Sequence, residues 1–289
     1  MKQALSIFTD NSQSLFESSI IFLSKLGIHC STETGGPIPV SCFFDNGMPQ
    51  YLSEALENIT NTYFIGVANN DSLSGSTTKD SLDDIAKLSQ DRGKYDGMLI
   101  FACDAKHNVK ISKLEVSSLT RAFNRIASEN PVIFILRQDD YISLATCERI
   151  DNSNGTGDKL GKVRTLRNIN CRKPHRGHID ILEMLREKSY TTFDELYNHW
   201  MEVFSNELLT KKFYSELSDW YAWAVKIVRF PNDIRTEKDD TIYNQESCIR
   251  LITRLIFVWF LKQKHLIPEE FFDEKYIHDN LISGFNPHD

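Results

Sequence analysis

The sequence predicts an α+β protein, with a mixed α/β domain over residues 1–187 followed by an all-helical connector over residues 188–289. Two observations support this fold class. In the first part, short apolar runs rich in Val, Ile and Phe are bounded by Gly, Pro, Asn and Asp, which is the pattern of buried strands in a sheet. In the second part, apolar residues recur at helical spacing instead. A chain of 289 residues is long enough for one or two domains with a sizeable core.

The first elements are a helix and a strand. Ser12–Leu26 has apolar residues at helical spacing, and Gly27 is a suitable residue to end that helix. Tyr63–Ala68 has the composition of a buried strand and precedes two asparagines.

The clearest unit is a strand, a helix and a second strand. Met98–Cys103 and Val132–Arg137 are the strands, and Lys113–Ser128 is the helix between them. A crossover of this length predicts a parallel strand pair. The helix residues expected to face the core are Leu114, Leu119, Phe123 and Ile126.

Two further strands and four helices complete the prediction. Tyr141–Cys147 follows closely enough to form a hairpin through Gln138–Asp140, and Lys162–Ile169 alternates polar and apolar residues. Helices are expected over Ile179–Leu185, Thr192–Phe204, Leu208–Ile227 and Gln245–Lys264.

Charge and cysteine content exclude several classes of protein. The net charge is −7, so the whole chain is not a basic nucleic-acid coat, and any contact with DNA must come from a local patch. The six cysteines are scattered without a C-x-x-C pair, which suits free thiols in a reducing compartment. The first residues have neither a basic segment nor a clean apolar run, so we expect a cytoplasmic protein with no membrane partner.

The segment Arg250–Pro268 contains the strongest apolar run of the chain. Seven consecutive apolar residues, Leu255–Leu261, lie between Arg254 and Lys262. Such a run is too short to cross a bilayer, which takes about 20 residues. As a helix it is apolar almost all round, so we expect it deep inside a helical bundle, covered in part by further polypeptide.

Four segments carry a family resemblance. Arg250–Phe272 and Leu208–Ala224 resemble the helices that precede the methylase domain in large single-chain bacterial restriction–modification proteins with an N6-adenine DNA methylase domain. Leu119–Ile150 and Gly161–Asn170 resemble the strand-rich N-terminal domain of the same proteins. The resemblance implies that the partners are DNA and a methylase domain, in cis or in trans, and that S-adenosylmethionine binds that methylase domain.

The motifs of methyl transfer are missing from this chain. A methylase of this class uses an [NDS]-P-P-[YFW] motif to hold the flipped base, and the sequence has no Pro-Pro pair; Asn286–His288 departs from the motif. The glycines Gly155 and Gly157 lie between two predicted strands and do not open a helix. We therefore expect the chain to contribute DNA contact and a helical platform, with no cofactor of its own.

The basic segment from Lys162 to Arg176 is the predicted DNA contact. It contains six basic side chains, one histidine and no acid, which is the charge pattern of a surface that binds phosphates. A solvated strand face followed by a loop is the competing interpretation. A bulge in the strand would bring its three basic residues to one face. The predicted DNA-binding residues are Lys162, Arg164, Arg167, Arg172, Lys173 and Arg176.

Two alternatives stay open. Asp96, Asp104 and Lys106 are similar to the acids and lysine of a PD-(D/E)-x-K nuclease, which would bind Mg²⁺, although they flank a single predicted strand. A non-catalytic protein-interaction module is the other alternative. Cys171, His175 and His178 lack a fourth ligand and match no common zinc spacing, so no metal site is expected there.

Overall fold

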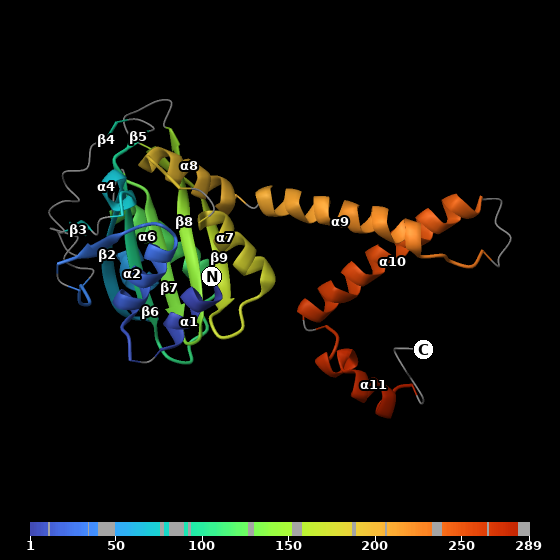
Figure 1. The fold of residues 1–289 in the computed structure, drawn as a ribbon. Coiled ribbons are helices and arrows are strands. Elements are labelled where there is room, and N and C mark those ends of the chain that lie inside the picture. Colours follow the sequence, from blue (N-terminus) through green and yellow to red (C-terminus); the bar gives the residue numbers. More distant parts are fainter. Residues whose placement is uncertain are drawn as a thin grey trace. The chain divides into compact units, whose positions relative to one another are not determined.

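The computed structural model describes residues 1–282, except 11, 34, 40–49, 76–77, 81–89, 92–93, 127–129, 152–157, 187–188, 206, 233–238 and 265 (Figure 1). It divides into two compact units, Met1–Leu209 and Thr210–Asp289. The glycines Gly155 and Gly157 and the segment Asn286–His288 lie outside the described residues.

The first unit is built on a five-stranded mixed sheet with the order β2-β6-β7-β8-β9. The pair β6–β7 is parallel and the other neighbouring pairs are antiparallel. The sheet confirms the α+β class and each predicted strand, including the parallel pair and the hairpin that follows it. The strands are β2 (Ile59–Asn69), β6 (Gly97–Ala105), β7 (Val132–Gln138), β8 (Tyr141–Asp151) and β9 (Asp158–Asn170).

Helices and short strand pairs surround this sheet. The short strands form a parallel pair, β1 with β3, and an antiparallel pair, β4 with β5. Their bounds are β1 (Cys30–Thr32), β3 (Thr78–Asp80), β4 (Gln90–Asp91) and β5 (Lys94–Tyr95). The helical elements are α1 (Lys2–Ser6), η1 (Ile7–Thr9), α2 (Leu15–Lys25), α3 (Gln50–Ala55), α4 (Asn70–Leu73), α6 (Lys113–Ile126), α7 (Arg176–Arg186) and α8 (Phe193–Phe204).

The ends of α2 show how the sequence sets a helix boundary. The backbone N–H of Glu17 donates to the Ser14 hydroxyl at 3.2 Å, and the Ser14 N–H donates to the Glu17 carboxylate at 2.9 Å. This reciprocal capping box satisfies two backbone donors that the first turn would leave without partners. After the helix, Gly27 has φ +88°, a conformation that side chains disfavour. The predicted helix and its glycine stop are confirmed.

Each face of the sheet has its own core. On one face, α6 covers β2, β6, β7 and β8, where the rings of Phe64, Phe101, Phe123 and Phe134 form a contiguous stack. On the other face, α1, α2, α7 and α8 pack against the same strands and β9. The layers are therefore helix, sheet and helices, which buries the central strands on both faces.

One predicted core residue of α6 is wrong. Leu119 and Phe123 are buried as expected, but Leu114 is 80% exposed. Val116 is the first residue of the helix to face the sheet, and two positions along a helix turn the side chain by about 200°, so Leu114 points away from it. The side chain of Ile126 lies outside the described residues.

The first unit also extends further than the sequence predicted. The predicted boundary near residue 187 assigned α8 to the helical connector, whereas the structure places the division after Leu209. The reason is packing: Leu182 and Leu185 of α7 and Trp200 and Phe204 of α8 belong to the core of the sheet. The amphipathic pattern showed that these helices bury one face, but it did not specify the element against which they pack.

The second unit is helical and has a small core. It consists of most of α9 (Glu207–Ile227) with α10 (Asp240–Gln263), η3 (Glu269–Phe272) and α11 (Glu274–Asn280). Its buried residues are Ala224, Asn244, Cys248 and Ile252. Asn244 joins the two long helices: its Oδ1 accepts from the backbone N–H of Phe230 at 3.0 Å, and its Nδ2 donates to the carbonyl of Val228 at 3.0 Å.

Replacing Asn244 with alanine is expected to loosen the hairpin of α9 and α10. The change leaves the backbone N–H of Phe230 without its side-chain acceptor and removes one of two donors to the carbonyl of Val228, which keeps the Arg229 guanidinium, so the expected cost is about 1 kcal/mol. Backbone hydrogen exchange from Val225 to Phe230 should therefore accelerate, measured by mass spectrometry on the full chain. Asn280→Ala is the control, because Asn280 bonds only within its own exposed helix. Equal exchange in both variants would contradict this role of Asn244.

Candidate functional site

The carboxylates of the predicted nuclease site lie at opposite ends of β6. Asp96 directly precedes the strand and Asp104 is its penultimate residue, so at about 3.3 Å per residue they are about 26 Å apart. Asp104 and the exposed Lys106 lie close together in the sequence at one end, but Asp96 does not join them. Among the described residues, no group of three or more His, Cys, Asp or Glu side chains is placed to hold a metal ion. This arrangement does not fit Mg²⁺ bound by the two acids.

The basic segment spans β9, the turn after it and the first residue of α7. Lys162, Lys173 and Arg176 are exposed and have no ion-pair partner among the residues that the structure describes. The remaining three basic side chains have partners. Arg164 pairs with Glu148 at 3.3 Å, Arg172 pairs with Asp140 at 2.7 Å, and Arg167 donates to the carbonyl of Ile111 at 3.2 Å.

The predicted common face of the basic strand residues is wrong for Arg167. Arg164 and Leu166 share a face because side chains alternate along a strand, and Leu166 belongs to the core beneath α7 and α8. Arg167 reaches Ile111, in the core beneath α6, so it lies on the opposite face. The register of β9 shifts twice, between Leu160 and Val163 and between Leu166 and Ile169, where Asn168 has φ +53°, and neither shift brings Arg167 to the face of Arg164. The exposed basic residues that remain together are those of the turn, Arg172 to Arg176.

Cys171, His175 and His178, whose spacing does not match a zinc site, lie in different surroundings. Cys171 is buried in the sheet core, and burial raises the pKa of its thiol to about 12. The rings of His175 and His178 lie 6.1 Å apart, and burial followed by the neighbouring His175 lowers the pKa of His178. Cys171 is therefore a core residue beside an exposed turn.

The glycine pair Gly155 and Gly157 lies outside the described residues, between the antiparallel strands β8 and β9. A glycine-rich cofactor loop is followed by a helix whose N-terminus faces the ligand, whereas β9 follows here.

A polar pocket of about 570 Å³ lies at the edge of the sheet where the parallel strands β6 and β7 end. Residues of η1 and β2, the turn after β7 and the turn after β9 complete its wall. Ligands commonly bind at the carboxyl ends of strands in open α/β sheets. Its lining residues are Phe8, Thr9, Gln13, Thr60, Asn61, Asp104, Ala105, His107, Arg137, Asp139, Asp140 and Arg172.

Most of this pocket was not foreseen from the sequence, which singled out only Asp104 and Arg172. A signal was present, because Asp104 and Arg137 close two strands that were predicted to be parallel. In the sheet they are register partners, and the Arg137 guanidinium binds both carboxylate oxygens of Asp104 at 2.7 and 3.2 Å. End-to-end alignment of the two predicted strands pairs Arg137 with Cys103, so the pair with Asp104 needed the register of the sheet, which is shifted by one residue.

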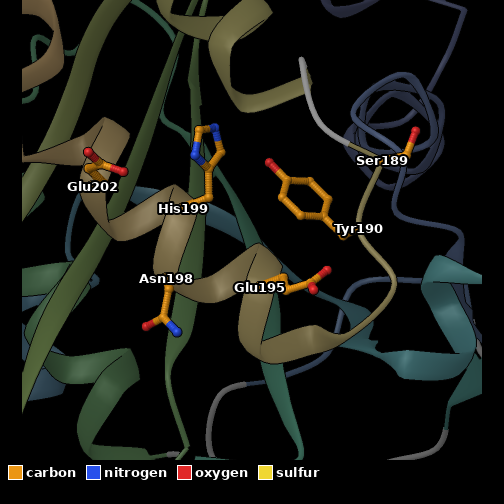
Figure 2. Close-up of a pocket in the computed structure, with 6 residues that line it drawn as sticks. All are labelled: Ser189, Tyr190, Glu195, Asn198, His199 and Glu202. Carbon is orange, nitrogen blue, oxygen red and sulfur yellow. The ribbon is translucent and has the colours of Figure 1, made fainter.

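A second pocket, of about 650 Å³, lies beside α8 and is lined by Ser189, Tyr190, Glu195, Asn198, His199 and Glu202. Figure 2 shows the side chains of Tyr190 and His199 next to each other, with ring centroids 5.9 Å apart. The Tyr190 hydroxyl donates to the carbonyl of Leu185 at 3.0 Å, and His199 Nε2 lies 3.0 Å from the carbonyl of Met184. These carbonyls belong to the last turn of α7, so the two side chains satisfy acceptors that a helix end leaves open.

The second unit presents an exposed apolar surface on α9 and α10. Phe257, Leu255 and Trp259 are 60%, 55% and 53% exposed, and the residues between them are exposed too. The prediction that this run lies deep inside a bundle is wrong for the chain as described. The exposed large apolar residues of the two helices are Phe213, Tyr214, Trp220, Trp223, Ile227, Ile242, Ile249, Leu251, Leu255, Ile256, Phe257, Val258, Trp259 and Phe260.

None of the helices within the described residues combines the length and apolar character needed to cross a membrane. No family model, curated protein or solved structure matches the chain. The functional argument therefore rests on the residues and their arrangement.

Proposed function

We propose that this chain is the DNA-facing, N-terminal portion of an adenine-specific restriction–modification protein. The first unit contacts DNA through its basic turn, and the second unit is the platform on which a methylase domain packs. In this proposal the methylase domain binds S-adenosylmethionine and transfers the methyl group, and the present chain does neither.

The observation that supports the platform most directly is the exposed apolar surface of α9 and α10. Soluble monomers rarely expose contiguous apolar patches of this extent, so such a surface indicates a binding partner. Leu255–Phe260 is exposed around the whole helix, which calls for a partner that covers several sides, as a folded domain does. These residues include those that resemble the pattern preceding a methylase domain, which is why a methylase domain is the proposed occupant.

The support for DNA contact is local positive charge. Lys173 and Arg176 are exposed, lack ion-pair partners among the described residues and belong to a segment with no acid. Arg172 is exposed beside them, although Asp140 neutralises part of its charge. Cationic side chains at a surface turn can reach the phosphates of DNA without entering a groove. We therefore expect contacts to the DNA backbone, with little sequence preference.

The DNA contact can be tested by neutralising the turn. A variant with Arg172→Gln, Lys173→Gln and Arg176→Gln should bind duplex DNA more weakly, because each lost phosphate contact releases one fewer counterion. The slope of the logarithm of affinity against the logarithm of salt concentration should become shallower by about two to three. Fluorescence anisotropy of a labelled duplex, titrated at several salt concentrations, measures both quantities.

A second triple variant separates local contact from overall charge. Lys2, Lys25 and Lys79 are exposed in the first unit and away from the turn in sequence, and replacing them with glutamine changes the net charge equally. The proposal requires the salt slope of this control to stay near that of the parent chain. Equal loss in both variants, or no DNA binding by the parent chain, would refute a DNA contact at the turn.

The exposed helices also favour a second candidate, a protein-interaction module without DNA contact. Both candidates place a partner on α9 and α10, and they differ only in the role of the first unit. The anisotropy titration distinguishes them, because the module predicts no salt-dependent DNA binding. The nuclease alternative gains nothing from the structure, since its two acids are separated by the length of β6.

A further inference from the structure

The pocket at the ends of β6 and β7 contains three basic side chains, two arginines and a histidine, each bound by its own carboxylate. In every pair the acid fixes the direction of the base, which is how proteins orient donors toward a ligand. The pairs are Arg137 with Asp104 at 2.7 Å, His107 with Asp139 at 2.6 Å, and Arg172 with Asp140 at 2.7 Å. Asp104 and Arg137 are paired across the two parallel strands, and the other two pairs join turns that the sheet brings to the same edge.

These pairs leave donors unused. Arg137 binds Asp104 through Nε and Nη2, so its Nη1 is not engaged in the pair. Arg172 uses its Nε, and His107 uses its Nδ1. Within the described residues, no other hydrogen bond occupies the terminal nitrogens of Arg172 or the Nε2 of His107. The pocket wall therefore includes guanidinium and imidazole nitrogens that can bind an anionic oxygen.

A buried acceptor in the same wall lacks a donor. Gln13 lines the pocket, and its Oε1 is buried with no hydrogen-bond partner among the described residues. An unpaired buried carbonyl is unfavourable, and a turn of the Gln13 side chain would bring this covered oxygen to a ligand N–H or O–H. The ligand therefore needs donors as well as an anionic group.

The turn between β7 and β8 supplies two carboxylates to the pocket. Gln138 and Tyr141 are paired, so Asp139 and Asp140 form a two-residue hairpin turn, and Asp139 has φ +49°. Aspartate tolerates this conformation because its short polar side chain can form local hydrogen bonds. The side chains of the two aspartates pair with His107 and Arg172 of the pocket.

We propose that this pocket binds a nucleoside phosphate. A phosphate matches the planar donors of arginine, and the hydroxyl and amino groups of a nucleoside supply donors for Gln13 and for the carboxylates. Because the three aspartates of the pocket outnumber its two arginines, a bare anion gains little there, and a ligand with both a phosphate and donors is preferred. A volume of about 570 Å³ lies within the range of small-ligand sites.

This inference does not rest on the DNA contact proposed above, since only Arg172 belongs to both surfaces. Two sources offer the same chemistry: a free nucleotide, or the phosphorylated end of a nucleic-acid strand. The probes are AMP, adenosine, inorganic phosphate, and a short oligonucleotide with and without a 5′-phosphate. Isothermal titration calorimetry on the full chain measures each affinity.

The matched variants are Arg172→Gln and Lys173→Gln. Both side chains are exposed in the same turn and carry the same charge, but only Arg172 lines the pocket. AMP should bind more tightly than adenosine or inorganic phosphate. The affinity for AMP should fall by about tenfold in Arg172→Gln and should stay unchanged in Lys173→Gln. Asp139→Asn keeps a residue suited to positive φ and removes the carboxylate that pairs with His107. The affinity for AMP should fall by several fold in this variant.

The outcomes separate the two proposals. The proposed nucleotide site is overturned if the parent chain binds neither AMP nor the 5′-phosphorylated oligonucleotide. It is also overturned if Arg172→Gln and Lys173→Gln weaken AMP binding equally. If the nucleotide site is overturned but DNA binding still falls in the triple variant of the turn, the proposed DNA contact stands on its own. Tighter binding of the 5′-phosphorylated oligonucleotide than of AMP supports the pocket and assigns it to a strand end, whereas the reverse supports it and assigns it to a free nucleotide. Unchanged circular dichroism in each variant establishes that folding is intact.

Discussion

Replacing Phe101 with alanine is expected to lower the free energy of unfolding of Met1–Leu209 by about 3–5 kcal/mol. Phe101 lies in β6, a central strand of the sheet, and is 0% exposed. Its ring centroid is 5.3 Å from that of Phe64 and 5.0 Å from that of Phe123. The substitution therefore removes the middle ring of a row that joins β2 to α6.

The surrounding structure cannot close the resulting cavity easily. β6 is hydrogen-bonded to β2 on one side and to β7 on the other, so its backbone cannot shift toward α6 without breaking a ladder. Most of the lost contact volume should remain as a void, which places the cost toward the upper end for such substitutions.

Urea unfolding followed by hydrogen exchange in peptides of β6 and β7 measures this effect in the first unit alone. Leu114→Ala is the control, because Leu114 is a large apolar residue of the same helix-and-sheet layer that faces solvent. Its effect should stay within about 0.5 kcal/mol. Similar losses in the two variants would show that the aromatic row does not hold α6 to the sheet.

The sequence predicts the central strands well because burial on both faces leaves a simple pattern. β6 and β7 are continuous apolar runs, as expected for strands covered by helices on both sides. β8 and β9 extend beyond their predicted ends, to Asp151 and from Asp158, because backbone pairing continues through polar residues. Apolar patterning records which side chains are buried, and it does not record how far the hydrogen bonds continue.

The apolar pattern of the sequence does not show which element packs against each buried helix face. The apolar faces of α7 and α8 suit a sheet and a helical connector equally, so the domain boundary was placed too early. The apolar run of α10 indicated a buried helix, but its partner is absent from the described residues. The pocket depends on residues from a strand end and two separate turns, Asp104, Asp140 and Arg172, that meet only through the register of the sheet.

The second large effect is expected on α10. We expect the exposed apolar surface to bind the dye 8-anilinonaphthalene-1-sulfonate and to cause concentration-dependent self-association of the full chain. Replacing Leu255, Phe257 and Trp259 with glutamine should remove most of the dye binding and the self-association. Each of these side chains is more than half exposed, so apolar surface open to the dye and to other copies is lost. Dye fluorescence and light scattering coupled to gel filtration, over a range of concentrations, measure the two changes.

Leu114→Gln is the control for this experiment, because it removes a single exposed leucine outside the helical unit. Isolated exposed apolar residues are ordinary on protein surfaces, so dye binding and association should stay unchanged. If the α10 variant behaves like the control, the apolar helix is covered within the chain in solution, and no partner is needed to explain it.

The substitutions on α10 test a surface and leave the fold of the unit in place. Asn244 joins α10 to the end of α9, Cys248 and Ile252 are the buried apolar residues of α10 among those described, and none of the three is changed. Glutamine is also a good helix former, so the helix itself should persist. A variant that keeps its helical circular dichroism while losing self-association would therefore assign the loss to the exposed apolar side chains. That result would make α10 a docking helix, which is the property that the proposed methylase platform requires.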